Sequence, residues 1–264
     1  MEVTRPDRQT AHLFGQGDFD IRFDWGPVGA RAVQADVSVI VDVLSFSTSV
    51  RVAVERGIRV FPCRWRGRSA EECAAQHDAV LSVGRLEATS DDAITAPSLS
   101  PTSLLACEAI PRLVLPSPNG STIAAVLHDS GSTVAAGCLR NARAVAQWLA
   151  QMVEAGKSIA VIGAGERWCE DDSMRHALED QLGAGAILSE VLALGYQDRL
   201  SPEALTTAEV FLAGRSHLRE RMAACVGGCE LVSKGFGSDV DIAGELNAST
   251  VVPVLIDGAF CSPP

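Results

Sequence analysis

Short apolar segments alternate along this chain with longer segments of helical period. Residues 36–44 (DVSVIVDVL) and 158–162 (SIAVI) are almost entirely apolar and rich in β-branched side chains, which is typical of strands covered on both faces of a sheet. Residues 20–25 instead place Ile, Phe and Trp at every second position, the period of a half-buried strand. The pattern therefore predicts both fully covered and half-buried strands.

The other apolar segments predict a regular succession of elements. Further strands are expected at residues 58–61, 79–83, 113–115, 133–136 and 251–256. Helices are expected in a segment ending at Gly57, at 70–77, at 122–128, from Asn141 to Val153, and at 178–194, 202–213, 217–224 and 239–246. Gly26 and Pro27 are expected to turn the chain. Because strand–loop–helix units repeat, we expect a largely parallel sheet with helices on both faces.

Two segments depart from this regular pattern. Residues 1–17 are polar and are expected to be loose, which leaves residues 18–264 as a single α/β domain. Between residues 84 and 111 the periodicity is lost, and prolines and short acidic or hydroxylated clusters mark a long excursion. Loops of this length in a compact domain are often functional. A functional lid and a floppy insertion therefore both stay open for this segment.

The net charge of the chain limits the classes of molecule that it is expected to bind. The formal net charge of −11 over 264 residues argues against a nucleic acid, because its phosphates attract Lys and Arg. Lys157 and Lys234 are the only lysines, so the other basic residues are arginines, which bind phosphate, sulfonate and carboxylate groups bidentately. A small anionic ligand therefore stays compatible with the acidic composition, and self-association into a homo-oligomer is left open.

Cysteine usage and hydropathy indicate the compartment. The eight cysteines are scattered, without a Cys-x-x-Cys pair or a signal-peptide pattern before them, and we expect reduced thiols in a cytoplasmic protein. No run of about 20 apolar residues is present, so we expect no membrane span.

The segment 158–187 is the most informative of the chain. The apolar strand runs into the glycine turn 163–165, an acidic loop follows, and a helix then opens with Glu179 and Asp180. Ligands in open α/β sheets bind beyond the carboxyl ends of the strands, so these carboxylates predict a metal or acid/base site. Neighbouring helical residues lie about 100° apart, so one of the pair is the expected magnesium ligand or general base. Acids in a first turn also stabilise the helix dipole without any further function.

Asp42 lies near the end of the most apolar strand. An ionised carboxylate there is unfavourable unless a cation or hydrogen-bond donors receive it, so we expect a metal ligand or nucleophile. The alternative is a carboxylate that caps a neighbouring loop. The Asp-x-Asp-x-Thr motif of haloacid dehalogenase phosphatases is excluded, because Leu44 stands two residues after Asp42.

Two further turns carry candidate anion-binding groups. Asn119 and Ser121 lie in a Ser-Pro-Asn-Gly-Ser turn at a helix start, where exposed N–H groups bind phosphate well, although the same residues also make a well-capped turn. Arg140 and Asn141 begin the next helix, and Arg140 is either a bidentate anion ligand or a solvated surface residue. Among the histidines, His176 beside the acidic loop is a candidate proton carrier.

These segments together resemble one family. The motifs that carry the resemblance follow in family order: Asp42-Val43-Leu44 with Ser47-Thr48, Pro118-Asn119-Gly120-Ser121, Gly137-x-Leu139-x-Asn141-Ala142, Ala164-Gly165-Glu166, Leu178-Glu179-Asp180-x-Leu182 with Ala184-Gly185-Ala186-Ile187, Gly235-Phe236-x-x-Asp239-Val240, and Asn247-x-Ser249-x-x-Val252-Pro253. Over roughly residues 35–258, the chain is similar to the ComB family of 2-phosphosulfolactate phosphatases.

The resemblance implies a magnesium-dependent hydrolase that converts 2-phospho-3-sulfolactate to 3-sulfolactate and phosphate, a step toward coenzyme M. It implies a three-layer α/β/α fold, whose sheet is largely parallel or mixed. Position by position, it implies Asp42, Asn119, Asn141, Glu179 and Asp180 as site residues. Our hypothesis is that Mg²⁺ is held by Asp42 with Glu179, Asp180 or both, as catalytic residues.

In the same hypothesis, Asn119, Ser121, Arg140 and Asn141 bind the substrate. The chain departs from the family in one important place, because Ser45 stands where the family commonly has Arg. Possible replacements for that charge are Arg85, Arg140, Arg143 and Arg167. Otherwise the substrate is a different small phospho-hydroxy acid, or the chain is a non-catalytic anion-binding paralogue.

Overall fold

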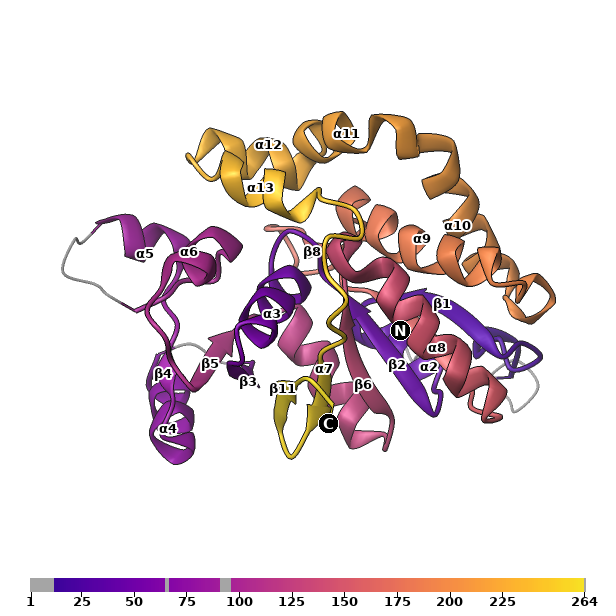
Figure 1. Ribbon diagram of the computed structural model, residues 1–264, viewed down its shortest axis with the longest axis horizontal. Coiled ribbons are helices and arrows are strands. Elements are labelled where there is room, and N and C mark those ends of the chain that lie inside the picture. The colour runs from indigo at the N-terminus through magenta and orange to yellow at the C-terminus, as the bar shows by residue number, and fades with distance from the viewer. Residues whose placement is uncertain (1–11, 65–66, 91–95, 264) are drawn as a thin grey trace.

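The computed structural model describes residues 12–64, 67–90 and 96–263. Within these residues a nine-stranded sheet has the order β1-β7-β2-β6-β10-β11-β3-β5-β4 (Figure 1). Its strands are β1 (Ile21–Trp25), β2 (Val37–Val41), β3 (Arg59–Cys63), β4 (Val80–Leu81), β5 (Arg112–Pro116), β6 (Thr133–Gly137), β7 (Ile159–Gly163), β10 (Val254–Ile256) and β11 (Ala259–Cys261). A small hairpin, β8 (Glu166–Arg167) and β9 (Met174–Arg175), lies outside the sheet.

The sheet joins two parallel blocks. Strands β1, β7, β2 and β6 run parallel to one another, and so do β3, β5 and β4. The antiparallel strands β10 and β11 connect the two blocks. The expectation of a largely parallel or mixed sheet is thereby confirmed.

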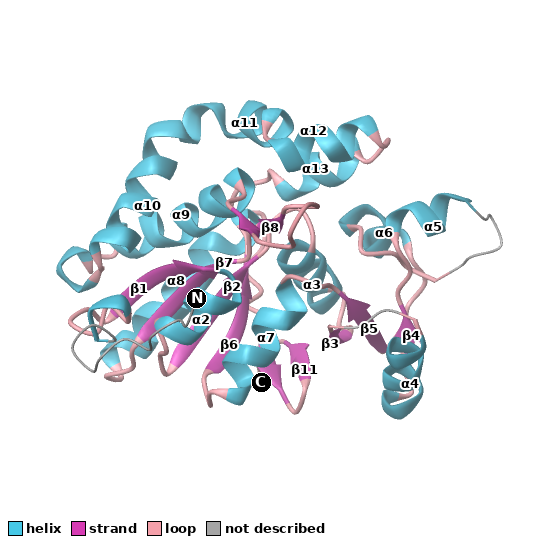
Figure 2. Ribbon diagram, turned by 180° about the vertical axis from the view of Figure 1, so that it is seen from behind, coloured by secondary structure: helices cyan, strands magenta, loops and turns pink. Residues whose placement is uncertain are grey.

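Helices cover both faces of the sheet, which confirms the three-layer arrangement (Figure 2). The described helices are α2 (Gly26–Ala32), α3 (Phe46–Glu55), α4 (Arg68–His77), α5 (Arg85–Ser90), α6 (Pro101–Ala106), α7 (Gly120–Asp129), α8 (Ala142–Glu154), α9 (Leu178–Ala193), α10 (Pro202–Gly214), α11 (Leu218–Ala224), α12 (Val226–Ser233) and α13 (Gly237–Ala243). No helix of this described set is both long and apolar enough to cross a membrane.

Each face of the sheet has its own apolar core. Side chains of β2 such as Val39 and Val41 pack with Leu149 of α8, Ile187 of α9 and Phe211 of α10. The alternate residue Ile40 faces the opposite core, formed with α2, α3 and α7. All residues of β2 are buried, as the continuous apolar pattern of 36–44 predicts.

Some elements differ from the sequence expectations. Gly26 and Pro27 do not merely turn the chain but begin α2, because proline is well suited to the first turn of a helix. Helix α12 lies between the expected helices 217–224 and 239–246, where no element was expected. A Cβ on Gly228 would lie 1.9 Å from the Met222 carbonyl oxygen, so glycine is required where α12 passes the end of α11.

The described part of the excursion 84–111 packs against the rest of the domain. Helix α6 contacts α3 and α13. The carboxylate of Asp239 on α13 accepts hydrogen bonds from the Ser100 hydroxyl at 2.6 Å and from the Thr102 amide at 3.2 Å. Arg85 of α5 forms an ion pair with the same carboxylate at 2.9 Å. Asp239 thus connects the start of α5 and the start of α6 to α13.

The predicted loose N-terminal segment lies partly outside the described residues, because residues 1–11 are not described. Within its described part, the side-chain amide of Gln16 donates to the Phe23 carbonyl at 2.8 Å and accepts from the Phe23 amide at 3.2 Å. This side chain occupies hydrogen-bonding groups on β1 that a further strand would use.

Close packing of α9 against α10 gives a first prediction. A Cβ on Gly185 would lie 2.5 Å from the Thr207 carbonyl oxygen, so we expect Gly185→Ala to push the helices apart. Overpacking of this kind costs about 1–3 kcal/mol, and the Tm measured by circular dichroism should fall by several degrees. Gly237→Ala is the control, because its nearest new neighbour is Val232 at 3.8 Å. An unchanged Tm in Gly185→Ala would contradict this packing.

Candidate active site

Acidic side chains from separate segments meet at the carboxyl ends of β2 and β7. Asp42 follows β2, Glu166 lies just beyond the glycine turn after β7, and Glu179 and Asp180 open α9. Asp42, Glu179 and Asp180 are buried, with exposed fractions of 6%, 3% and 4%. We call these four residues the acidic cluster.

Burial and neighbouring charges raise the pKa of three carboxyl groups of the acidic cluster. Burial and then the charge of Glu166 raise the pKa of Asp42 to about 7. Burial and then the charges of Asp42 and Glu179 raise the pKa of Asp180 well above its usual value. Burial and then the charge of Glu179 also raise the pKa of Glu166. Such mutual repulsion makes the cluster a strong candidate for holding a cation.

Asp180 ties the two strand ends together. One carboxylate oxygen accepts from the Val43 amide at 2.7 Å, and the other accepts from the Gly165 amide at 2.9 Å. The loops after β2 and β7 are therefore held at a fixed separation. Both oxygens of Asp180 are used in this way.

Asp42 has one carboxylate oxygen to spare. Its Oδ1 accepts from the Phe46 amide at 3.1 Å, whereas its buried Oδ2 has no hydrogen-bond partner in the described part of the chain. The Gly120 amide at the start of α7 lowers the pKa of Asp42, so this helix terminus faces the same carboxylate. An unpartnered buried oxygen is unfavourable unless a proton or cation occupies its side.

Glu179 points away from Asp180, toward α12. Its Oε1 lies 2.3 Å from the position that a Cβ on Gly227 would take, so glycine makes room for this carboxylate. Burial and then the charge of Glu179 raise the pKa of the Cys225 thiol to about 12. The neighbours Glu179 and Asp180 thus have different surroundings, in agreement with the roughly 100° between them on a helix.

The turn before α7 brings Asn119 to the acidic cluster, but not Ser121. The Asn119 amide donates to Glu166 Oε2 at 3.1 Å and its carbonyl accepts from Arg167 Nε at 3.3 Å. The Ser121 hydroxyl, in the first turn of α7, instead donates to the Leu115 carbonyl of β5 at 3.4 Å.

Arg140 and Asn141 make their hydrogen bonds elsewhere. The Asn141 side chain accepts from the Cys138 amide and donates to the Val251 carbonyl, both at 2.9 Å. Arg140 pairs with Glu245 and donates to the Ile242 carbonyl. In the described structure, these bonds hold the C-terminal segment, and none reaches the acidic cluster.

Arg85 also belongs to the site. The sequence names it only as a possible source of positive charge in place of the arginine that the resemblance implies at position 45. Its Nη2 donates to the Leu44 carbonyl at 2.6 Å, and its charge lowers the pKa of Asp42. Helix α5 begins at Arg85, far along the chain from β2, so spacing alone gives no signal for this contact. Glu166 was not among the predicted catalytic residues. Its position directly after the glycine turn that ends an apolar strand is the signal that could have identified it.

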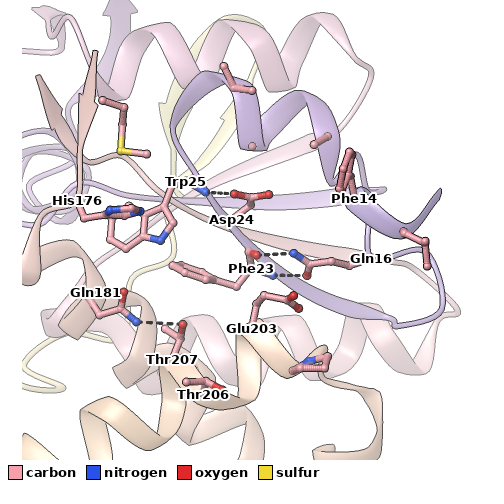
Figure 3. A pocket seen from close by; sticks show the side chains of 16 residues that line it. Phe14, Gln16, Phe23, Asp24, Trp25, His176, Gln181, Glu203, Thr206 and Thr207 are labelled. Atoms are coloured by element: carbon pink, nitrogen blue, oxygen red, sulfur yellow. Dashed lines mark hydrogen bonds between the residues drawn. The ribbon is translucent and has the colours of Figure 1, made fainter. Parts of the chain in front are cut away.

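Two cavities lie near this end of the sheet. One of about 430 Å³ is lined by Asn119 and Glu166 and borders the acidic cluster. The other, of about 880 Å³, lies along β1 and is lined by Asp24, Trp25 and Glu203 (Figure 3). His176 belongs to this second cavity, where its ring packs edge-on against Trp25 with centroids 4.8 Å apart. No residue of the acidic cluster lines the cavity of Figure 3, so the smaller cavity is the candidate active site.

Comparison with known proteins decides the family. Residues 28–258 match the family model described as 2-phosphosulpholactate phosphatase, a span that includes every residue of the acidic cluster. The chain belongs to this family. It is also 29% identical over 230 residues to a protein of Deinococcus radiodurans named probable 2-phosphosulfolactate phosphatase, which covers 84% of this chain and 89% of that relative. The resemblance drawn from the motifs is confirmed.

Metal binding in this 2-phosphosulpholactate phosphatase family member stays an expectation. Among the described residues, no group of three His, Cys, Asp or Glu side chains stands ready to hold a metal ion. The roles of Asp42, Glu179 and Asp180 as metal ligands therefore stay predictions, as do the substrate-binding roles of the other sequence candidates.

The raised pKa of Asp42 predicts how stability depends on pH. Because the folded pKa of about 7 exceeds the ordinary 3.8, this group stabilises the fold fully below about pH 4 and loses that contribution as pH rises through 7. Asp42→Asn cannot ionise, so with EDTA its Tm should exceed that of the wild type by several degrees at pH 8. The difference should shrink at pH 5. Asp241→Asn, at a surface pair with Arg219, is the control, and an equal Asp42→Asn effect at both pH values would refute the prediction.

Proposed function

We propose that this protein is a phosphoric monoester hydrolase that releases phosphate from 2-phospho-3-sulfolactate at the acidic cluster, with Mg²⁺ as cofactor. The observation that best supports this proposal is the buried Oδ2 of Asp42, which has no hydrogen-bond partner within the described residues and lies among further carboxylates, opposite the start of α7. Membership of the family supports the reaction class, and the name of the relative supports the substrate.

The buried Oδ2 of Asp42, unpartnered in the described part of the structure, suits a hard divalent cation. Carboxylate oxygens are the ligands that Mg²⁺ takes up in phosphate-handling sites. In our proposal, Asp42 Oδ2 and the carboxylates of Glu166 and Glu179 hold the ion, while Asp180 keeps the two loops in place through its backbone bonds. When bound, the ion neutralises charge on the phosphoryl group and lowers the pKa of a water molecule.

Protein groups supply orientation and proton transfer. The N-terminus of α7 faces Asp42, and backbone N–H groups in such a position attract phosphoryl oxygens. Asn119 holds Glu166 through its amide and so fixes the wall of the cavity nearest the cluster. The pKa of Asp42 is about 7 and the pKa of Glu166 is raised by burial, and carboxyl groups with raised pKa values suit general acid–base work.

The proposal includes a cytoplasmic location and a step on the route to coenzyme M. The cysteines of the described chain are free thiols, several of them buried, as expected of a reducing compartment. The pathway rests on the substrate named for the family.

Phosphate release tests the function. We expect release from 2-phospho-3-sulfolactate with Mg²⁺ and a loss of at least ~100-fold with EDTA, since the ion supplies most of the charge neutralisation. Asp42→Asn and Glu166→Gln should each lower kcat by about 100-fold or more. Glu170→Gln, an exposed acid in the same loop, is the matched control and should retain wild-type rates. Full turnover of Asp42→Asn at saturating Mg²⁺ would exclude this site.

A further inference from the structure

The proposed substrate needs cations that the acidic cluster does not provide. It carries a phosphate, a carboxylate and a sulfonate. The carboxylate is bonded to the carbon that carries the phosphate ester. It must therefore stay beside the reacting group. The sulfonate lies one carbon further out and must find its partner in the adjoining cavity.

Most of the arginines considered for this role have other partners. Arg85 pairs with Asp239 and donates to the Leu44 carbonyl. Its guanidinium group therefore holds the loop after β2 in place. Arg140 is buried against the C-terminal segment, paired with Glu245. Arg143 lies on the surface with its side chain 62% exposed and paired with Glu190.

Arg167 has the right neighbours. It follows Glu166 directly, and its Nε donates to the Asn119 carbonyl oxygen at 3.3 Å. Its Nη1 donates to the carbonyl and carboxylate oxygens of Asp172 at 3.0 and 2.8 Å, while Nη2 makes no hydrogen bond within the described residues. The Asp172 side chain is 78% exposed, so solvent screens its charge.

A second arginine lines the same cavity. Arg31, in the last turn of α2, borders the cavity of about 430 Å³ together with Arg167, Asn119 and Glu166. Arg31 is exposed, and it forms no ion pair with any residue that the structure describes. The volume is sufficient for a small phospho-acid.

We propose that Arg167, together with Arg31, forms the sulfonate subsite of this enzyme and sets its preference for a sulfonated phosphoester. This inference rests on the proposed function, since it assigns a further group of the same substrate. The Nη2 amino group of Arg167 and the guanidinium of Arg31 bind the sulfonate oxygens, and Asn119 fixes the direction of Arg167 through Nε. Both arginines act in binding, not in the chemical step.

The test compares two substrates that differ only in the sulfonate. For Arg167→Gln, KM for 2-phospho-3-sulfolactate should rise at least ~10-fold while KM for phospholactate changes less than about twofold, with kcat retained. Arg31→Gln should change KM in the same direction. Arg143→Gln is the matched control and should leave both substrates unaffected. Equal effects on the two substrates, or none, would overturn the subsite and leave the phosphatase activity standing.

A binding measurement separates this inference from the activity. Calorimetry with 3-sulfolactate in EDTA should show binding to the wild type and to Asp42→Asn, with at least ~10-fold weaker binding to Arg167→Gln. If no phosphoester is hydrolysed but this pattern holds, the subsite stands and the proposed activity fails. If 3-sulfolactate does not bind, or binds equally to Arg167→Gln, the subsite is refuted. Matching Tm values for the variants exclude misfolding as the cause.

Discussion

The site depends on one buried carboxylate. Asp180 joins the Val43 and Gly165 amides, and these residues lie just beyond Val41 and Gly163, which are register partners in parallel strands. Parallel pairing brings the strand ends together, and Asp180 determines how the following loops leave the sheet. This position buries Asp180 and places it beside Asp42 and Glu179, and burial first, then the two neighbouring charges, raise its pKa well above the usual value.

The surrounding elements offset this concentration of negative charge. The start of α7 and the guanidinium of Arg85 both lower the pKa of Asp42. Arg85 is in turn held by Asp239, which also receives the Ser100 hydroxyl. The ionisation of Asp42, at the end of β2, is consequently linked to the excursion 84–111 and to α13. A change in how the excursion packs should therefore alter the charge state of the site.

Sequence patterns predicted the elements better than the contacts. The apolar run 36–44 and the helix from residue 178 were recognisable because burial on both faces and helical period leave a signal in neighbouring residues. The partners of Arg85 and Arg140 were not, since they are supplied by α13 and the segment after it. The sequence suggested an anion-binding role for Arg140, whereas its observed hydrogen bonds hold the C-terminal segment. A side chain that forms a tertiary contact looks the same in sequence as one that binds a ligand.

The positive charges and the carboxylates near this cavity are placed under different constraints. A cation acts through space, so any loop that borders the cavity can supply it, whereas a buried carboxylate such as Asp180 must occupy one position to reach both amides. Arg167 belongs to the β8–β9 hairpin and Arg31 to α2, and both border the cavity beside Glu166. The three-dimensional arrangement places these two guanidinium groups, which are far apart in the sequence, beside the same cavity.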